Sequence, residues 1–156
     1  MTPNAKPELK VATWNIRAGL GTDLRRDAGR VLDGIAALDA DLVALQEADF
    51  RMGLRPSALP RDVIRDRTGL GPLPLGRSAA SLGWHGNAIL VRPGFHMVGL
   101  ERLDLPGIEP RGAVIVEEVV IGEPAAGIGD GDELAGAGMI EPELALAVRI
   151  EHPLHA

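Results

Sequence analysis

Two polar residues stand at the ends of short apolar runs in the first third of the chain. Asn15 follows the run Leu9–Trp14, and Glu47 follows Leu42–Gln46. A carboxylate at the end of a buried strand is costly unless a cation neutralises it, and Mg²⁺ prefers oxygen ligands of this kind. Glu47 is therefore a candidate metal ligand. An amide such as Asn15 offers a donor and an acceptor without adding charge. The spacing alone also fits a glutamate that caps the next segment and an asparagine that turns the chain.

Two further side chains are candidates for contact with a phosphate. Arg17 lies two residues after Asn15, and its alternative is an exposed arginine in a turn. His85 stands just before the apolar run Asn87–Arg92, where it can donate a hydrogen bond to a phosphate oxygen or titrate near neutral pH. A surface histidine is the alternative. A third group is the cluster of arginines at 51, 55, 61, 65 and 67. Because aspartates interleave with these arginines, a solvated face is favoured over a phosphate-binding patch.

The elements that position Asn15 and Glu47 form a strand–helix–strand pattern. Residues 9–16 and 42–46 are apolar enough for a sheet buried on both faces. Between them the apolar residues at 31, 32, 35 and 38 share one helical face, with Asp23 as the expected cap and Asp39 near the end. Short joints of this type usually make a parallel crossover, and a mixed sheet is equally compatible with the spacing.

The remaining elements are expected to be a helix and several strands. The pattern predicts a helix over 58–68, a loop over 69–83, and strands over 87–92, 95–103 and 111–121. The pair Glu117 and Glu118 favours an edge position for the last of these strands. Residues 142–150 fit either a short strand or a helix.

Three segments together resemble a known family. Trp14-Asn15-Ile16-Arg17, then Leu45-Gln46-Glu47, then Trp84 to Leu90 resemble the endonuclease/exonuclease/phosphatase superfamily, over about residues 8–121. The resemblance implies an α/β fold, here a partial two-sheet α/β sandwich. It also implies Mg²⁺- or Mn²⁺-dependent hydrolysis of phosphodiesters or phosphomonoesters. Asn15 and Glu47 would be the catalytic and metal-binding residues. Arg17 and His85 would bind the substrate.

The family's later motifs are missing from the sequence. They are a Thr-His or Val-His pair, a Gly-Asp-Phe-Asn turn and a Ser-Asp-His triplet; Gly129–Asp132 lacks the aromatic residue and the asparagine of that turn. We therefore expect residues 8–121 to be the N-terminal portion of the domain, and 122–156 to be an acidic, glycine-rich tail from a shifted reading frame or a truncated gene. Such a chain would be inactive alone. The alternative is a non-catalytic module that retains the metal pocket and binds a phosphorylated ligand or a partner protein.

Composition sets the remaining limits. The 156 residues are 46% hydrophobic and 24% charged, which is typical of a soluble globular protein, and the cytoplasm is the default location. No apolar stretch is long enough for a membrane helix, and the absence of cysteine excludes disulfides and thiolate chemistry. The net charge of −6 falls within residues 122–156. Nucleic acid, inositol phosphate and phospholipid head groups all remain possible substrates, and an exposed sheet face favours self-association.

Overall fold

The computed structural model describes residues 9–106, 111–121 and 146–149, and the chain divides into two compact units, Met1–Pro93 and Gly94–Ala156. The first unit carries all the helices of the described residues and a four-stranded sheet. The second carries a three-stranded sheet. The expected α/β class with two sheets is confirmed. Within these ranges, no helix combines the length and the apolar character that crossing a bilayer requires.

The sheet of the first unit has the strand order β1-β2-β4-β3. β1 (Val11–Asn15) and β2 (Leu42–Gln46) are parallel, and β4 (Ala88–Val91) pairs antiparallel with β2 on its other side. The expected parallel crossover is therefore confirmed, within a mixed sheet. Every residue of β2 is buried because it has strands on both sides and an apolar sequence, whereas most of β1 is exposed at the edge.

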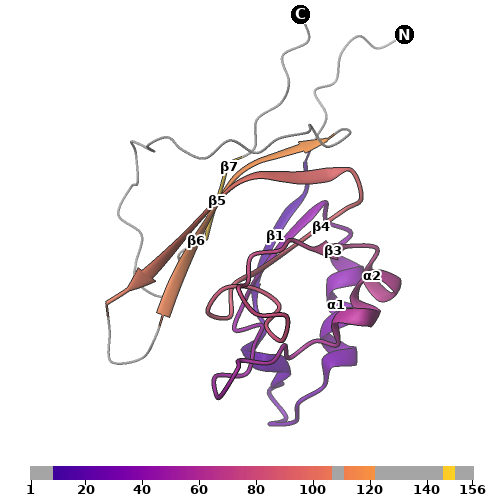
Figure 1. Ribbon diagram of the computed structural model, residues 1–156. Coiled ribbons are helices and arrows are strands. Elements are labelled where there is room, and N and C mark those ends of the chain that lie inside the picture. The colour runs from indigo at the N-terminus through magenta and orange to yellow at the C-terminus, as the bar shows by residue number, and fades with distance from the viewer. Residues whose placement is uncertain (1–8, 107–110, 122–145, 150–156) are drawn as a thin grey trace, which may run out of the picture. The chain divides into compact units, whose positions relative to one another are not determined.

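Two helices, α1 (Ala28–Leu38) and α2 (Arg61–Thr68), lie on the same face of this sheet (Figure 1). Their apolar sides bury a core because apolar residues recur at helical spacing. The residues of this core come from both helices and from β2 and β4, and include Val31, Leu32, Ile35, Val43, Leu45, Ile64 and Leu90. The core fixes how β1 and β2 meet, and so fixes the strand ends that carry Asn15 and Glu47.

The ends of α1 differ in part from the expectation. Asp27, not Asp23, is the N-cap, and its side chain accepts a hydrogen bond from the backbone N–H of Arg30 at 3.0 Å. Asp23 instead accepts from the guanidinium of the same arginine, at 3.0 and 3.2 Å. Arg30 thus donates hydrogen bonds to both aspartates, and Asp27, the nearer of the two in sequence, caps the helix. The helix ends as expected at Asp39, which adopts a left-handed conformation with φ 45°.

Three other expectations need correction or completion. α2 begins at Arg61 because Pro60 takes the N-cap position, and the expected loop 69–83 contains a two-residue strand, β3 (Gly71–Pro72), which pairs with β4. In the second unit β6 (Arg111–Ile121) lies between β5 (Phe95–Leu105) and β7 (Leu146–Arg149), so the expected edge position was wrong. Of the predicted tail, only β7 belongs to the described residues.

Candidate functional site

Asn15 and Glu47 meet at one edge of the first sheet. Asn15 ends β1 opposite Gln46 in the parallel register, and Glu47 follows Gln46 directly. Because the carboxyl ends of parallel strands reach the same edge, the two side chains come together, and Asn15 Nδ2 donates a hydrogen bond to Glu47 Oε1 at 3.1 Å. Beneath them, Gln46 Nε2 donates to Thr13 Oγ1 at 3.0 Å and ties the strands together. The two residues singled out by sequence are therefore direct partners.

The orientation of the Asn15 amide is set by its second partner. Asn15 Oδ1 accepts a hydrogen bond from the backbone N–H of Arg17 at 3.0 Å, which turns the amide nitrogen toward Glu47. A donor facing a carboxylate holds it in place. In this arrangement Asn15 orients Glu47. The prediction that Asn15 also ligates a metal stays a prediction. The Arg17 side chain itself is exposed.

The backbone of Glu47 joins the third predicted segment to the site. Glu47 O accepts from the N–H of Ala18 at 2.8 Å, and the N–H of Ala48 donates to Gly86 O at 2.8 Å. Gly86 has φ 85°, and a Cβ atom there would lie 3.4 Å from the Cα of Glu47. His85 directly precedes Gly86 in the sequence, so it belongs to the segment that packs against the backbone of Glu47. All four predicted site residues therefore belong to segments that meet around Glu47.

Four non-glycine residues of these segments have left-handed backbone conformations. They have φ angles between 48° and 51° and are Arg17, Ala18, Glu47 and His85. Such angles are uncommon for residues with a Cβ atom, and they persist only where the surrounding structure holds them. Here the backbone hydrogen bonds of Ala18 and Ala48 supply that support. In the described part of the chain, four of the seven non-glycine residues with positive φ therefore belong to the segments that meet around Glu47.

An arginine that sequence reasoning placed elsewhere lies beside the carboxylate. Arg51 NH2 is 3.7 Å from Glu47 Oε1, and the two side chains are 63% and 40% exposed. The sequence signal for this pair was the i, i+4 spacing, but Arg51 was interpreted as part of a solvated arginine cluster. The exposure of Glu47 leaves room for a hydrated cation to reach the carboxylate. Arg51 supplies a positive charge at the same place.

Asp49 is a second residue that the sequence did not reveal. Its side chain is buried, 4% exposed, and accepts hydrogen bonds from the hydroxyl of Ser81 and, at 2.8 Å, from the backbone N–H of Leu82. The Ser81 hydroxyl also contacts Gly83, with 2.7 Å to its carbonyl oxygen. These bonds attach the segment before His85 to the segment after Glu47. Asp49 thus supports the site from beneath.

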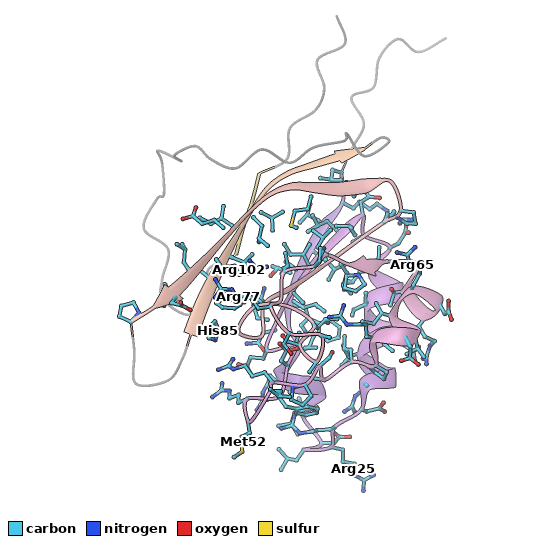
Figure 2. All side chains as sticks on the ribbon, viewed as in Figure 1. Arg25, Met52, Arg65, Arg77, His85 and Arg102 are labelled. Atoms are coloured by element: carbon cyan, nitrogen blue, oxygen red, sulfur yellow. The ribbon has the colours of Figure 1, made fainter. Side chains whose placement is uncertain are left out.

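His85 lies among aromatic and cationic side chains. Its ring packs edge-on against Trp84, with 4.6 Å between ring centroids and 78° between planes. The guanidinium of Arg77 lies 5.1 Å from the centroid of the Trp84 ring, and Figure 2 shows Arg77 close to His85. Cations stacked on aromatic rings retain their charge for a ligand. This part of the site combines hydrogen-bond donors with positive charge, as a phosphate requires.

The donor set around Glu47 fits an Mg²⁺ or Mn²⁺ ion that keeps most of its bound water molecules. Such ions are often bound through one or two carboxylates, with water completing the shell. Glu47 supplies one partly exposed carboxylate. Among the residues that the structure describes, no group of three or more His, Cys, Asp or Glu side chains gathers around a possible metal position. Glu47 is therefore the residue of this region that would hold the ion.

Comparison with protein families shows which family the chain resembles over most of its length. The model of the Endonuclease/Exonuclease/phosphatase family matches residues 12–148, which include β1, β2 and the segments around Glu47 and His85. The match extends beyond residue 121, where the resemblance read from the motifs stops. No curated protein sequence matches the chain.

Two solved structures are similar to parts of the chain. The endonuclease/exonuclease/phosphatase from Beutenbergia cavernae DSM 12333 is 22% identical with a TM-score of 0.45, and the similarity covers 70% of this chain and 36% of that one. ANGEL2, a 2′,3′-cyclic phosphatase in complex with adenosine-2′,3′-vanadate, is 14% identical with a TM-score of 0.38, over 70% of this chain and 40% of that one. This chain thus covers less than half the length of either structure.

Proposed function

The chain belongs to the endonuclease/exonuclease/phosphatase family, whose members generally hydrolyse phosphate esters, and from that premise we propose that its Glu47 site binds a divalent cation and a phosphate ester for metal-dependent hydrolysis. The observation that carries the proposal is the hydrogen bond from Asn15 Nδ2 to Glu47 Oε1, 3.1 Å long, at the shared edge of two parallel strands. It holds a carboxylate ready at the position where the family's motifs would use it.

Each residue has a defined task in this proposal. Glu47 holds the ion, Asn15 fixes the carboxylate, and Arg17 and His85 contact the oxygens of the phosphate. A bound Mg²⁺ or Mn²⁺ would supply charge neutralisation and polarisation of the phosphoryl group. Positioned donors around a phosphate lower the barrier because they face charge that develops during the reaction. The rigid backbone around Glu47 keeps these groups in place before the substrate arrives.

A second candidate function is a non-catalytic module that binds a phosphorylated ligand through the same pocket. The observation that favours it is the guanidinium of Arg51, which lies 3.7 Å from Glu47 Oε1. Cationic side chains suffice to bind a phosphate, whereas hydrolysis also needs an oriented attacking water. In both functions the site binds a metal ion and a phosphate group, but only in the first is the phosphate ester hydrolysed.

The test compares the full chain with Glu47→Gln, which keeps the size of the side chain and removes its charge. Mn²⁺ binding is measured by electron paramagnetic resonance of the free ion, and turnover by release of nitrophenolate from bis(p-nitrophenyl) phosphate. We expect the substitution to weaken Mn²⁺ binding by at least about tenfold, because loss of a residue that only supports a metal ligand already costs about ten- to a hundredfold. It should also abolish any hydrolysis.

Glu101→Gln is the matched control, because Glu101 is an exposed glutamate on β5 in the other unit. It should leave both measurements unchanged. Mn²⁺ affinity that is equal in the wild type and in Glu47→Gln would contradict the metal site. Metal binding that depends on Glu47 without any turnover of phosphodiesters or phosphomonoesters would select the non-catalytic module.

A further inference from the structure

Two loops of the first unit present apolar side chains to solvent. The first loop comprises residues 20–26 and the second residues 49–57, and we call them the Leu24 loop and the Phe50 loop. Leu24 is 77% exposed, and on the second loop Met52 and Leu54 are 85% and 78% exposed. Single exposed apolar residues are ordinary, but three large ones at neighbouring loop tips indicate a surface that meets something apolar.

Both loops are well-formed structures. An antiparallel bridge between Leu20 and Arg26 closes the Leu24 loop, and one between Asp49 and Ser57 closes the Phe50 loop. Leu24 has a φ of 60°, a left-handed conformation that is unfavourable for a bulky residue. Glycine or asparagine would fit this position at lower cost. A leucine at this exposed tip thus costs stability, and the fold does not require a leucine here.

One arginine joins the two loops. The guanidinium of Arg26 lies 5.3 Å from the centroid of the Phe50 ring and donates hydrogen bonds to the carbonyl oxygens of Arg17 and Ala18, at 3.2 and 2.7 Å. These contacts fix the Leu24 loop against the Phe50 loop and against the turn that follows β1. Figure 2 shows Arg25 and Met52 projecting at the same end of this unit. The two loops therefore lie at one end of the first unit, and we call their exposed side chains the loop surface.

This surface is positively charged, although the chain carries a net charge of −6. The Leu24 and Phe50 loops, residues 20–26 and 49–57, contain four arginines, at 25, 26, 51 and 55, against two aspartates, Asp23 and Asp49. Asp23 is paired with the guanidinium of Arg30, and Asp49 is buried, where it accepts a hydrogen bond from the backbone N–H of Leu82. The surface thus combines projecting aliphatic and thioether side chains with an excess of positive charge.

We propose that the Leu24 and Phe50 loops are a docking surface for an anionic lipid bilayer. Apolar side chains gain free energy when they leave water for the acyl boundary, and arginines around them are attracted to anionic head groups. A nucleic acid would satisfy the charge but would leave Leu24, Met52 and Leu54 without an apolar partner. Arg51 connects the surface to Glu47, so docking brings the candidate site next to the head groups.

The test is co-sedimentation of the full chain with vesicles, which does not depend on catalytic turnover. Vesicles of phosphatidylcholine with about one third phosphatidylserine are compared with phosphatidylcholine alone. We expect binding to the anionic vesicles, weakened by high salt. Combined Leu24→Ser, Met52→Ser and Leu54→Ser should reduce the affinity by at least about tenfold, and Arg25→Gln by about fivefold. The substituted residues are exposed, so folding is expected to be unaffected, which circular dichroism checks.

Matched controls come from other parts of the same unit. Val11→Ser with Leu38→Ser removes apolar side chains that are 55% and 45% exposed outside the two loops, and Arg65→Gln removes an exposed arginine on α2. Figure 2 places Arg65 far from Met52. These variants should bind as the wild type does. The proposal is overturned if the wild type ignores anionic vesicles, or if the triple variant binds them equally well. It is also overturned if the triple variant loses only self-association in analytical ultracentrifugation, or only oligonucleotide binding.

Discussion

At the scale of single residues, Glu47 is shared between a neutral donor and a cation. Asn15 and Arg51 both contact the same oxygen, Oε1, at 3.1 and 3.7 Å. The amide of Asn15 is uncharged, so it orients the carboxylate without neutralising it. The guanidinium of Arg51 is positive and would compete with a metal ion for the negative charge of Glu47. Under the proposed function, Arg51 would reduce affinity for the ion and add affinity for a phosphate.

Arg51→Gln should therefore strengthen Mn²⁺ binding by the full chain. The pair with Glu47 is exposed, and exposed ion pairs are worth little, so we expect an increase of about two- to fivefold. The same variant should bind inorganic phosphate more weakly. Titration calorimetry with each ligand measures both effects. Arg25→Gln removes a positive charge from the neighbouring loop without touching Glu47, and it should change Mn²⁺ affinity less. An unchanged or lower Mn²⁺ affinity in Arg51→Gln would show that the arginine does not compete.

The sequence predicted the pair Asn15 and Glu47 because strand ends have a regular geometry. Two parallel strands with one crossover must bring their carboxyl ends to one edge, so residue order alone places the two side chains together. Arg51 and Asp49 lie in a loop, where contacts depend on turns that no periodicity encodes. The arginine cluster shows the same limit. The structure places Arg51 beside Glu47, whereas Arg67 pairs with Asp33 on α1.

At the scale of elements, the strands and helices of the first unit were predicted more accurately than their ends. β2 has the predicted bounds because the apolar run stops at polar residues on both sides. The start of α1 was misplaced because two aspartates compete for one arginine and the sequence does not show which one caps the helix. The short strand β3 was missed because Gly71 and Pro72 are turn residues, and only pairing with β4 makes them a strand.

An acidic residue at the end of α1 connects three elements of this unit. Asp39 pairs with Lys10 before β1 at 3.1 Å and with Arg92 after β4 at 2.5 Å. The hydrogen bond from Arg92, and then that from Lys10, lower the pKa of the Asp39 carboxyl below its ordinary value of 3.8. A carboxyl group whose pKa is lowered by folding adds stability above its ordinary pKa, and this contribution is lost as the pH falls through the folded-state pKa.

Asp39→Asn should therefore lower the urea midpoint of unfolding at about pH 7, and the difference from the wild type should disappear at about pH 2. Asparagine tolerates the left-handed conformation at this position, so the substitution isolates the charge. The effect should be small because the group is exposed. Asp66→Asn is the control because it removes an exposed carboxylate of α2 outside the Lys10–Asp39–Arg92 contacts, and it should change the midpoint less. A midpoint difference that persists at low pH would assign the effect to the backbone.

At the scale of the whole molecule, the buried core and the predicted site share one unit. The hydrophobic core cluster consists of residues between Ile16 and Leu90, and the four predicted site residues belong to the same unit, Met1–Pro93. In the second unit, the buried apolar residues among the described side chains are Ala113, Val114 and Val116. Local stability follows buried apolar contact and paired backbone. The first unit therefore provides the firmer support, and it is the unit that positions the carboxylate.

Hydrogen exchange of the full chain should show this difference directly. Amides of Val43, Ala44 and Leu45 lie in β2, which is fully buried and paired on both sides, so they should be among the slowest to exchange. Amides of β5 and β6 should exchange at least about tenfold faster after correction for intrinsic rates. Mass spectrometry of peptides from each strand measures both, and exchange at two pH values checks that the rates report opening equilibria. Equal protection of β2 and β6 would instead mean that the two units open as one cooperative structure, so a substitution in either would disturb the Glu47 site.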